Sequence, residues 1–340
     1  MDKIVKVVVD AMGGDHAPAA PVQGAVDAVN ERNDVYVYLT GQEDVIKSEL
    51  AKYTYPKDRI EIVHASEVIE TAEPPVKAIK GKKDSSLVVG LTKVRHEEAD
   101  AIVSAGSTGA VLVGGQVIVG RIKGVERPAL APLIPTVKGM SLLIDCGANV
   151  DARPSHLVQF AKMGSIYMEH NMGIKNPKVG ILNIGAEEEK GNALVKETFP
   201  QLKACTDIHF IGSIEARDVL SGKADVIVCE AFAGNCVLKT IEGTAATLIQ
   251  EIKTELKASV KGKVGGMLIK PSLKGVLKRF DSSEHGGAPL LGLKGLVVKC
   301  HGSSSSKEIK NSIFQCAQFA KEDISGKIKE NIQNQNEVNE

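Results

Sequence analysis

Short apolar runs alternate along this chain with loops of glycine and small polar residues, and each loop leads into a helical pattern. An unbroken Val/Ile run is typical of a buried parallel strand. Five such runs precede glycine-bearing loops, at 4–9, 101–103, 142–144, 179–182 and 226–228. Glycine lets backbone N–H groups approach a ligand, and the following helix presents its positive end to an anion. Any one loop could be an ordinary βα turn, but together they predict one large site for an anionic substrate beyond the strand ends.

The alternation continues over almost the whole chain. We expect strands near 4–9, 35–40, 60–64, 101–104, 142–146, 178–184, 207–212, 225–230 and 295–301. Helical patterns fill most of the gaps, at 19–32, 42–52, 84–98, 108–120, 154–171, 188–203, 213–221, 235–261 and 304–331. This order predicts an α/β fold with a doubly wound, mostly parallel sheet and helices on both faces. We expect a single catalytic domain over 1–332 and a disordered, frayed tail over 333–340.

The segment 245–280 departs from this alternation. Its apolar residues recur at helical spacing, and its basic residues exceed its acidic ones by six. One basic stripe follows the i, i+4, i+8 spacing: Lys253, Lys257 and Lys261. The pattern predicts a protruding amphipathic helical pair that contacts an anionic membrane surface through this stripe and through Leu256 and Val260. The alternative is a helical hairpin that packs its apolar face in a dimer or in the core.

Composition narrows the class of protein. The 340 residues carry 42 basic and 42 acidic side chains, so no global charge favours nucleic acid as a partner. Tryptophan is absent and aromatic residues make up 4%, which leaves few stacking platforms for single strands. The six cysteines form no CxxC motif and are typical of reduced thiols in a cytosolic protein. No apolar stretch approaches the ~20 residues of a membrane span, so we expect a cytoplasmic protein that associates peripherally with membranes.

Familiar cofactor and nucleophile motifs do not occur in the sequence. There is no GxxxxGK[ST] loop for a nucleotide and no GxGxxG fingerprint with a later ribose-binding acid. Neither HExxH nor a Cys/His cluster has the spacing of metal ligands, and GxSxG is missing. We therefore expect no cofactor and no metal. What remains is a glycine-rich anion site without an evident protein nucleophile.

Six segments together resemble the signatures of the acyl-ACP:phosphate acyltransferases, the PlsX family. They follow the family's order and spacing from about residue 4 to 331: DAMGGDHAP (10–18), SAGSTGA (104–110), DCGANVDARP (145–154), NIGAEEEKGN (183–192), AFAGNCVLKTIEG (231–243) and GGAPLLGLKGLVVKCHGSS (286–304). One departure is Ser107, which stands where the family usually has Asn.

The resemblance implies a fold, an activity and partners. The family transfers a long-chain acyl group from the acyl carrier protein (ACP) to inorganic phosphate, at the start of bacterial phospholipid synthesis. The resemblance implies a homodimer with a Rossmann-like fold, related to isocitrate and isopropylmalate dehydrogenases. It also implies that the acyl-phosphate is made beside the downstream membrane acyltransferase that consumes it.

This chemistry needs no catalytic triad. The second pKa of a phosphate group lies near neutrality, and a thiolate whose pKa is about 8.5 is a good leaving group. The enzyme has to hold phosphate against the carbonyl carbon and stabilise the tetrahedral oxyanion. These needs explain why no strong base or protein nucleophile is visible.

Three side chains are the catalytic candidates. Lys190 could hold phosphate or the oxyanion, or else be a solvated lysine near a helix start. Asn235 could donate its amide N–H to the carbonyl oxygen, or else cap a helix. His16 could orient phosphate or protonate the leaving sulfur, or else be a hydrogen-bonded loop residue.

The remaining candidates line the predicted anion site. Arg153 suits bidentate phosphate binding, and Asn149 could add an anion contact. Asp10, Asp15 and Asp145 are expected to tie loops together through backbone N–H groups. The full set of expected phosphate- and substrate-binding residues is Gly13, Gly14, Asp15, Ser107, Thr108, Gly109, Asn149, Arg153, Gly185, Gly191 and Gly234.

Three other functions compete with this prediction. A phosphotransacylase acting on short acyl-CoA would share the chemistry but would not need the basic helical pair. A non-catalytic scaffold at a lipid surface would make no acyl-phosphate from any donor. An NAD-dependent decarboxylating dehydrogenase of the related fold would need a nicotinamide site and metal-binding carboxylates, for which the sequence has no motif.

Overall fold

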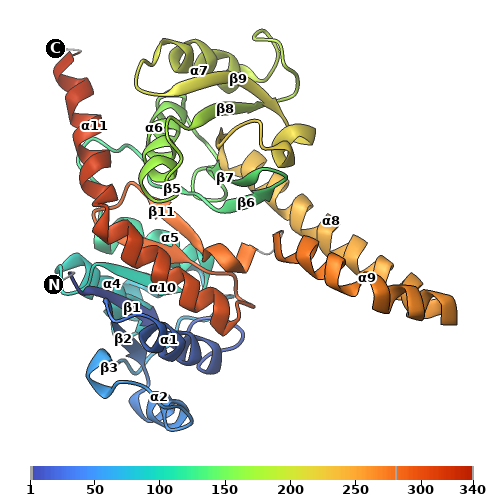
Figure 1. Ribbon diagram of the computed structural model, residues 1–340. Coiled ribbons are helices and arrows are strands. Elements are labelled where there is room, and N and C mark those ends of the chain that lie inside the picture. The colour runs from blue at the N-terminus through green and yellow to red at the C-terminus, as the bar shows by residue number, and fades with distance from the viewer. Residues whose placement is uncertain (1–2, 280–281, 339–340) are drawn as a thin grey trace.

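Two sheets position the glycine-rich loops (Figure 1). The computed structural model describes residues 3–279 and 282–338, and these contain a larger and a smaller sheet. In spatial order the larger sheet consists of β3 (Ile60–His64), β2 (Val35–Gly41), β1 (Val5–Asp10), β4 (Ala101–Ser104), β12 (Leu296–Lys299), β11 (Ala288–Leu291) and β5 (Ala129–Leu130). The smaller sheet consists of β6 (Leu133–Thr136), β7 (Gly139–Ile144), β10 (Val226–Val228), β8 (Lys178–Asn183) and β9 (His209–Glu215).

Most strand pairs are parallel, as the apolar runs predicted. The antiparallel pairs join β11 to β12, β11 to β5 and β6 to β7. In the larger sheet Val9 of β1 pairs with Val103 of β4, and in the smaller sheet Val228 of β10 pairs with Ile144 of β7. These side chains are fully buried because helices cover both faces of each sheet. The predicted fold class is confirmed, although the strands divide between two sheets.

Helices fill the chain between the strands. They are α1 (Ala19–Glu31), α2 (Glu43–Leu50), α3 (Pro75–Gly81), α4 (Ser86–Arg95), α5 (Thr108–Gly114), α6 (Pro154–His170), α7 (Ala193–Ala204), α8 (Ala231–Ala258), α9 (Val260–Arg279), α10 (Ser306–Lys321) and α11 (Ile324–Val338). A π-helical turn, η2 (Gly115–Val119), continues α5, and short 3₁₀ helices are η1 (Lys57–Arg59), η3 (Ala216–Ser221) and η4 (Ser282–His285).

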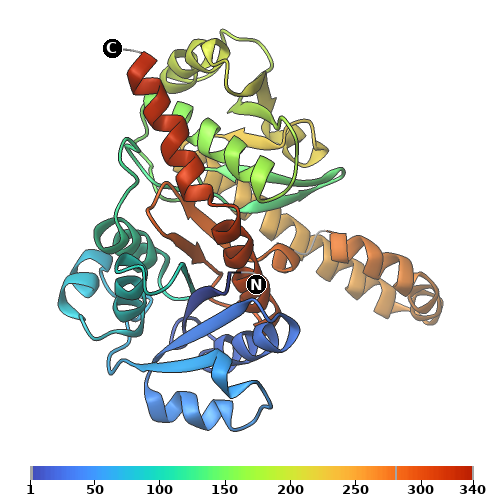
Figure 2. The ribbon, with the colours of Figure 1, turned by 60° about the vertical axis from the view of Figure 1, so that its left-hand side comes forward.

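The two sheets are joined by a shared core. On the larger sheet α1 and α10 cover one face, while α4 and α5 cover the other. On the smaller sheet α6 covers one face and the start of α8 the other. Helix α11 leaves α10 and packs on α6 (Figures 1 and 2). The amide of Gln315 on α10 donates to the hydroxyl of Tyr167 on α6 at 2.8 Å, so α6 is bonded to the larger sheet's helical layer.

Several elements differ from those expected. Strands β5, β6 and β11 were not predicted because they are short, and β6 and β11 contain proline. Helix α3, whose first residue is the second of two consecutive prolines, was also missed. The helix expected at 213–221 is instead the end of β9 followed by η3.

The last described helix is α11. Ile324, Ile328 and Ile332 bury one face of α11, and the helix continues to Val338 because no Gly or Pro interrupts it. Residues 339–340 lie outside the described part.

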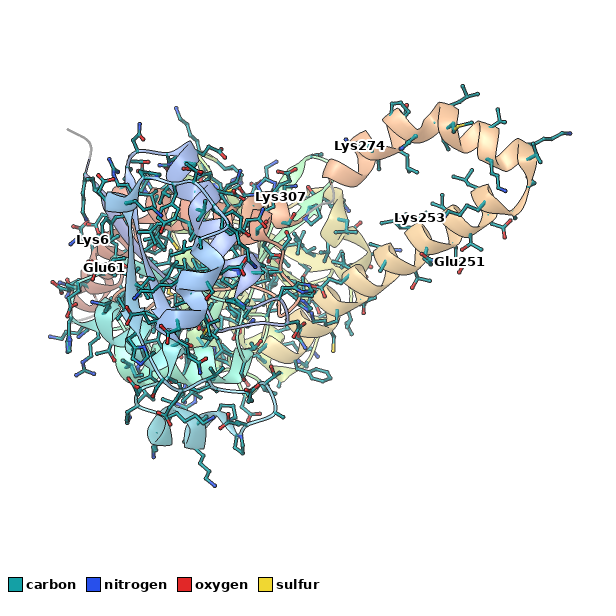
Figure 3. All side chains as sticks on the ribbon, turned by 90° about the horizontal axis from the view of Figure 1, so that it is seen from below. Lys6, Glu61, Glu251, Lys253, Lys274 and Lys307 are labelled. Atoms are coloured by element: carbon teal, nitrogen blue, oxygen red, sulfur yellow. The ribbon has the colours of Figure 1, made fainter. Side chains whose placement is uncertain are left out.

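Helices α8 and α9 form a hairpin that projects from the body (Figures 1 and 2). They are separated by Ser259, whose hydroxyl accepts a hydrogen bond from the N–H of Gly262 at 2.9 Å. Figure 3 shows Lys253 on α8 and Lys274 on α9, both on this projection. Val260 is 78% exposed. Leu256 is half-buried because it packs against Gly266 of α9. A Cβ added at Gly266 would lie 3.6 Å from the Leu256 side chain.

Close packing of α1 on α10 gives a test of the fold. A Cβ added at Gly24 would lie 2.7 Å from both the Ser306 carbonyl oxygen and the Ile309 Cβ. Gly24→Ala gains about 1 kcal/mol in helix propensity but costs about 1–3 kcal/mol through overpacking, so we expect a net loss of stability. Gly243→Ala on α8, where nothing lies within 4 Å, should not destabilise the protein. Urea unfolding measures both variants, and a stabilised Gly24→Ala protein would contradict the packing.

Candidate functional site

The loops after β1, β4 and β12 interlock at the carboxyl edge of the larger sheet. The Ser104 hydroxyl donates to Asp10 Oδ2 at 2.7 Å, and the Asp15 N–H donates to the Gly302 carbonyl at 2.7 Å. A Cβ at Gly13 would lie 2.7 Å from the Gly106 nitrogen. Gly14 has φ +98°, a conformation that favours glycine. These loops can therefore approach one another only through their glycines.

The predicted residues of these loops have different positions. Asp15 and His16 are exposed at the edge of the sheet, where they can meet a ligand. Ser107 is buried and its hydroxyl accepts from the Ala110 N–H at 3.5 Å, so it caps α5. Thr108 is exposed in the first turn of α5, whereas a Cβ at Gly109 would lie 2.5 Å from Pro75 Cγ. Gly109 therefore serves the packing of α5 on α3.

Lys299 is a charged residue at this edge that the sequence analysis did not single out. It ends β12, pairs in register with Ser104 and is buried, with its ammonium group donating to the Cys300 carbonyl. Burial lowers the pKa of Lys299, and the nearby acids Asp10 and Asp15 oppose that shift. The signal in the sequence is a lysine that directly ends an apolar strand.

Asp145 organises the corresponding edge of the smaller sheet. Its Oδ1 accepts from the N–H groups of Leu130 and Ala148 at 3.0 and 3.1 Å, and its Oδ2 accepts from the N–H of Asn149 at 2.8 Å. The Asn149 side-chain amide donates to Asp145 Oδ2 at 2.7 Å and to the Pro128 carbonyl at 2.8 Å. Both amide protons of Asn149 are thus engaged, so this geometry favours a structural role over the anion contact that we expected.

Lys190 lies in the loop after β8 and its side chain is held above Gly185. A Cβ at Gly185 would lie 2.5 Å from Lys190 Cδ, so this path of the lysine stem depends on glycine. The Lys190 ammonium is exposed and lies 2.8 Å from Glu187 Oε2. This hydrogen bond raises the pKa of Lys190. The loop turns at Gly191, which has φ +111°. It is held by the Asn183 side-chain amide, which donates to the Lys190 carbonyl at 3.1 Å.

Asn235 lies within α8, which follows the neighbouring strand β10. The residue that caps α8 is Glu230, whose carboxylate accepts from the N–H groups of Phe232 and Ala233 at 2.6 and 2.8 Å. The alternative role of Asn235 as a helix cap is therefore wrong. Its side chain is exposed, and among residues 3–279 and 282–338 it has no hydrogen-bond partner. The base of α8 is fixed at Gly234, where a Cβ would overlap the Asp145 carbonyl oxygen.

Strand order brings Lys190 and Asn235 to the same edge. Strands β8 and β10 are parallel neighbours, with Val179 paired to Val226. The loop that carries Lys190 and the helix that carries Asn235 both leave from the carboxyl ends of these strands. A cation and an amide donor at adjacent strand ends can polarise a carbonyl oxygen and hold an anion.

Arg153 lines a different, polar cavity. It is exposed at the start of α6, in an open cavity of about 290 Å³ with Arg121, Glu126, Arg127 and His156. Three guanidinium groups around one carboxylate make this cavity electropositive. It is consistent with the anion contact expected of Arg153, but it shares no lining residue with the Lys190 loop.

Solved structures share this fold. The chain is similar to a phosphotransacetylase from Streptococcus pyogenes, at 17% identity and TM-score 0.62 over 94% of this chain and 95% of that one. It is also similar to the EutD phosphotransacetylase from Staphylococcus aureus, at 19% identity and TM-score 0.60 over 93% and 94%. At such identities the likeness defines the fold class alone, a Rossmann-like α/β protein.

Sequence relatives define the family. The model of the family described as "Fatty acid synthesis protein" matches residues 5–327. A phosphate acyltransferase from Clostridium perfringens is 52% identical over 96% of this chain and 97% of its own length. One from Clostridium botulinum is 50% identical over 98% and 100%. The chain therefore belongs to the fatty acid synthesis protein family, which confirms the resemblance to the PlsX acyltransferases.

His156 gives a pH-dependent test of the Arg153 loop. Its Nδ1 accepts from the Arg153 N–H at 3.1 Å and its Nε2 lies 3.1 Å from Glu126, a geometry of neutral imidazole. Burial lowers the pKa of His156 below its ordinary 6.5, so the unfolded chain binds more protons. We expect neutral His156 to contribute its full share of the free energy of unfolding above pH 6.5. This contribution, about 1 kcal/mol, should be lost as the pH falls through the folded-state pKa.

An NMR titration of His156 together with urea unfolding at several pH values measures both effects. His156→Phe should flatten the stability profile in this range. A pKa at or above 6.5 would contradict the assignment.

Proposed function

We propose that this protein transfers a long-chain acyl group from acyl-ACP to inorganic phosphate, giving acyl-phosphate for phospholipid synthesis. The family and its curated relatives support acyl transfer to phosphate, and the acyl-ACP donor is the finer part of the proposal. The observation that carries it is the pair formed by the exposed Lys190 ammonium and the free Asn235 amide at adjacent strand ends.

The proposed reaction is a direct displacement at the thioester. A phosphate oxygen attacks the carbonyl carbon, the tetrahedral oxyanion collapses, and the C–S bond breaks as the leaving sulfur is protonated to a thiol. Lys190 stays cationic because its pKa is raised by Glu187, and phosphate can replace that carboxylate because the ion pair is solvent-exposed. Asn235 donates its amide N–H to the developing oxyanion. His16, exposed after β1, supplies the proton for the leaving sulfur.

Substitution of Lys190, the proposed phosphate-binding residue, and of Asn235, the proposed oxyanion donor, tests this mechanism. Lys190→Ala and Asn235→Ala should each lower kcat with palmitoyl-ACP and phosphate by about 10²- to 10³-fold, the usual effect of losing one preorganised donor. Both residues are exposed, so thermal unfolding should stay close to that of the wild type. Acyl-phosphate is measured by mass spectrometry.

Matched controls are available on the same elements. Lys203→Ala removes an exposed lysine that pairs with Glu188, and Thr240→Ala removes an exposed polar side chain further along α8. Both should retain wild-type turnover. Near-wild-type kcat in Lys190→Ala or Asn235→Ala would refute the assignment.

The competing functions are separated by substrate. Turnover of acetyl-CoA in preference to palmitoyl-ACP would indicate a short-chain phosphotransacylase, the activity named for the structural neighbours. Absence of acyl-phosphate from every donor would indicate a scaffold. Reduction of NAD in a nicotinamide absorbance assay would indicate a dehydrogenase.

We also propose that the α8–α9 hairpin binds an anionic membrane surface, with acidic ACP as a second partner. No helix among the described residues is long and apolar enough to cross a bilayer. The hairpin instead exposes both apolar and basic residues near its end: Val260, Lys261, Lys263, Val264, Met267 and Leu268. Cations near an anionic surface contribute about 1 kcal/mol each, and the apolar side chains add interfacial burial. The protein would work as a cytoplasmic, peripherally bound homodimer beside the membrane acyltransferase that takes its product.

Exposed and packed residues of the hairpin allow membrane contact and hairpin stability to be tested with different variants. Val260→Glu combined with Leu268→Glu places charge on side chains that are 78% and 77% exposed, so we expect loss of binding to phosphatidylglycerol vesicles with soluble turnover unchanged. Leu256→Glu should instead disturb the hairpin, because Leu256 packs on Gly266. Vesicle sedimentation, circular dichroism and analytical ultracentrifugation measure binding, helicity and the dimer. Retained vesicle binding in the double variant would refute the membrane contact.

A further inference from the structure

An apolar cavity of about 240 Å³ lies at the carboxyl edge of the smaller sheet. It is enclosed by the end of β8, the first turn of α7, the start of η3, the end of β10 and the first turn of α8. Its apolar lining comprises Leu157, Ile181, Leu182, Ile184, Leu194, Val195, Ala216, Cys229 and Ala233. The lining also includes Asn183, Gly191, Asn192 and Glu230 but no cationic side chain, so the cavity differs in chemistry from the arginine-lined cavity at α6.

The polar residues around the cavity are already satisfied by the protein. The Asn183 side chain donates to Ser213 Oγ at 3.1 Å and accepts from the Ile184 N–H at 2.8 Å. Asn192 Oδ1 accepts from the Val195 N–H at 2.9 Å, and the Glu230 carboxylate caps α8. A polar ligand would find few free partners here, whereas an apolar ligand would leave no polar group newly unpaired.

The cysteine in the lining does not change this character. Burial raises the pKa of Cys229 well above its ordinary value, so it remains a neutral thiol at physiological pH. Its Sγ contacts the Asp145 carbonyl oxygen at 3.5 Å. A neutral thiol in this setting acts as a small apolar side chain rather than a nucleophile.

The cavity adjoins the proposed reaction centre. Gly191 in its wall directly follows Lys190, and Ala233 precedes Asn235 by two residues on α8. Ile184 in the wall is 81% exposed, and Phe232, next to Ala233, is 66% exposed. Two large apolar side chains exposed beside an apolar cavity form a hydrophobic rim that continues to the surface.

We infer that this cavity binds the part of the acyl chain nearest to the thioester carbonyl, an inference that rests on the proposed function. At about 30 Å³ for each water-sized group, the cavity has room for about eight methylenes. A longer chain would leave over the rim at Ile184. Each buried methylene should raise kcat/KM by up to about fourfold until the cavity is full.

Substitutions at Leu194 test the inference in both directions. Leu194 is half-buried in the first turn of α7 and lines the cavity. With donors from butyryl- to palmitoyl-ACP, wild-type kcat/KM should rise with chain length to a plateau near ten carbons. Leu194→Phe fills the cavity and should move the plateau to shorter chains, with at least a tenfold loss for decanoyl-ACP and little change for butyryl-ACP. Leu194→Ala enlarges the cavity and should move the plateau to longer chains.

The control is the adjacent Ala193→Phe, which adds an aromatic ring at an exposed position of α7 outside the lining. It should keep the wild-type profile, and thermal unfolding checks that each variant folds. An active wild type whose chain-length profile is the same in Leu194→Phe and Ala193→Phe would overturn the inference while leaving the proposed function intact.

A binding measurement that needs no turnover tests the cavity assignment separately from the proposed acyl transfer. Calorimetry with decanoate should show binding that weakens at least tenfold in Leu194→Phe and is unchanged in Ala193→Phe. If the wild type makes no acyl-phosphate from any donor, the proposed function fails, and this measurement still decides whether the cavity takes an acyl chain. Equal decanoate affinity in the wild type and Leu194→Phe would overturn the cavity assignment.

Discussion

The buried carboxylate of Asp145 is the constraint on which the arrangement of the two sheets depends. It accepts hydrogen bonds from Leu130 on the larger sheet and from Ala148 and Asn149 in its own loop. Removing the carboxylate would leave several buried donors unpaired, at about 1–3 kcal/mol each. Its carbonyl also contacts Gly234, so the same residue fixes the start of α8. The position of Asn235 relative to the larger sheet therefore depends on this one residue, through its carboxylate on one side and its backbone carbonyl on the other.

Two glycines determine the path of the Lys190 side chain and of its loop. The stem of Lys190 crosses Gly185 so closely that a methyl group there would displace it, and the loop can turn because Gly191 adopts a positive φ. The cation is therefore directed by backbone shape rather than by a buried ion pair. Such a site can exchange the Glu187 carboxylate for an incoming anion without leaving a buried charge unpaired.

The sequence predicted what local patterns determine. The Val-rich runs located the central strands, and the glycine-rich loops after them are the ones that meet at the sheet edges. The division into two sheets was not predictable, because it depends on β5, a two-residue strand that pairs with the distant β11, and on β6, a short strand that contains proline and pairs only with β7. The inward position of Leu256 depends on the angle of the α8–α9 turn, and the cap at Glu230 was hidden because Asn235 matched a more familiar capping residue.

The loops and cavities of the protein offer different environments to the two halves of the proposed substrate pair. Phosphate is strongly hydrated and needs N–H groups and cations, which the loops of the larger sheet, the α6 cavity and Lys190 supply. An acyl chain needs a dry apolar wall, which the cavity beside α7 supplies. Because β8 and β10 are adjacent, the cation and the apolar wall leave from the same strand ends. That adjacency would let a hydrocarbon be anchored while the carbonyl carbon remains within reach of the anion.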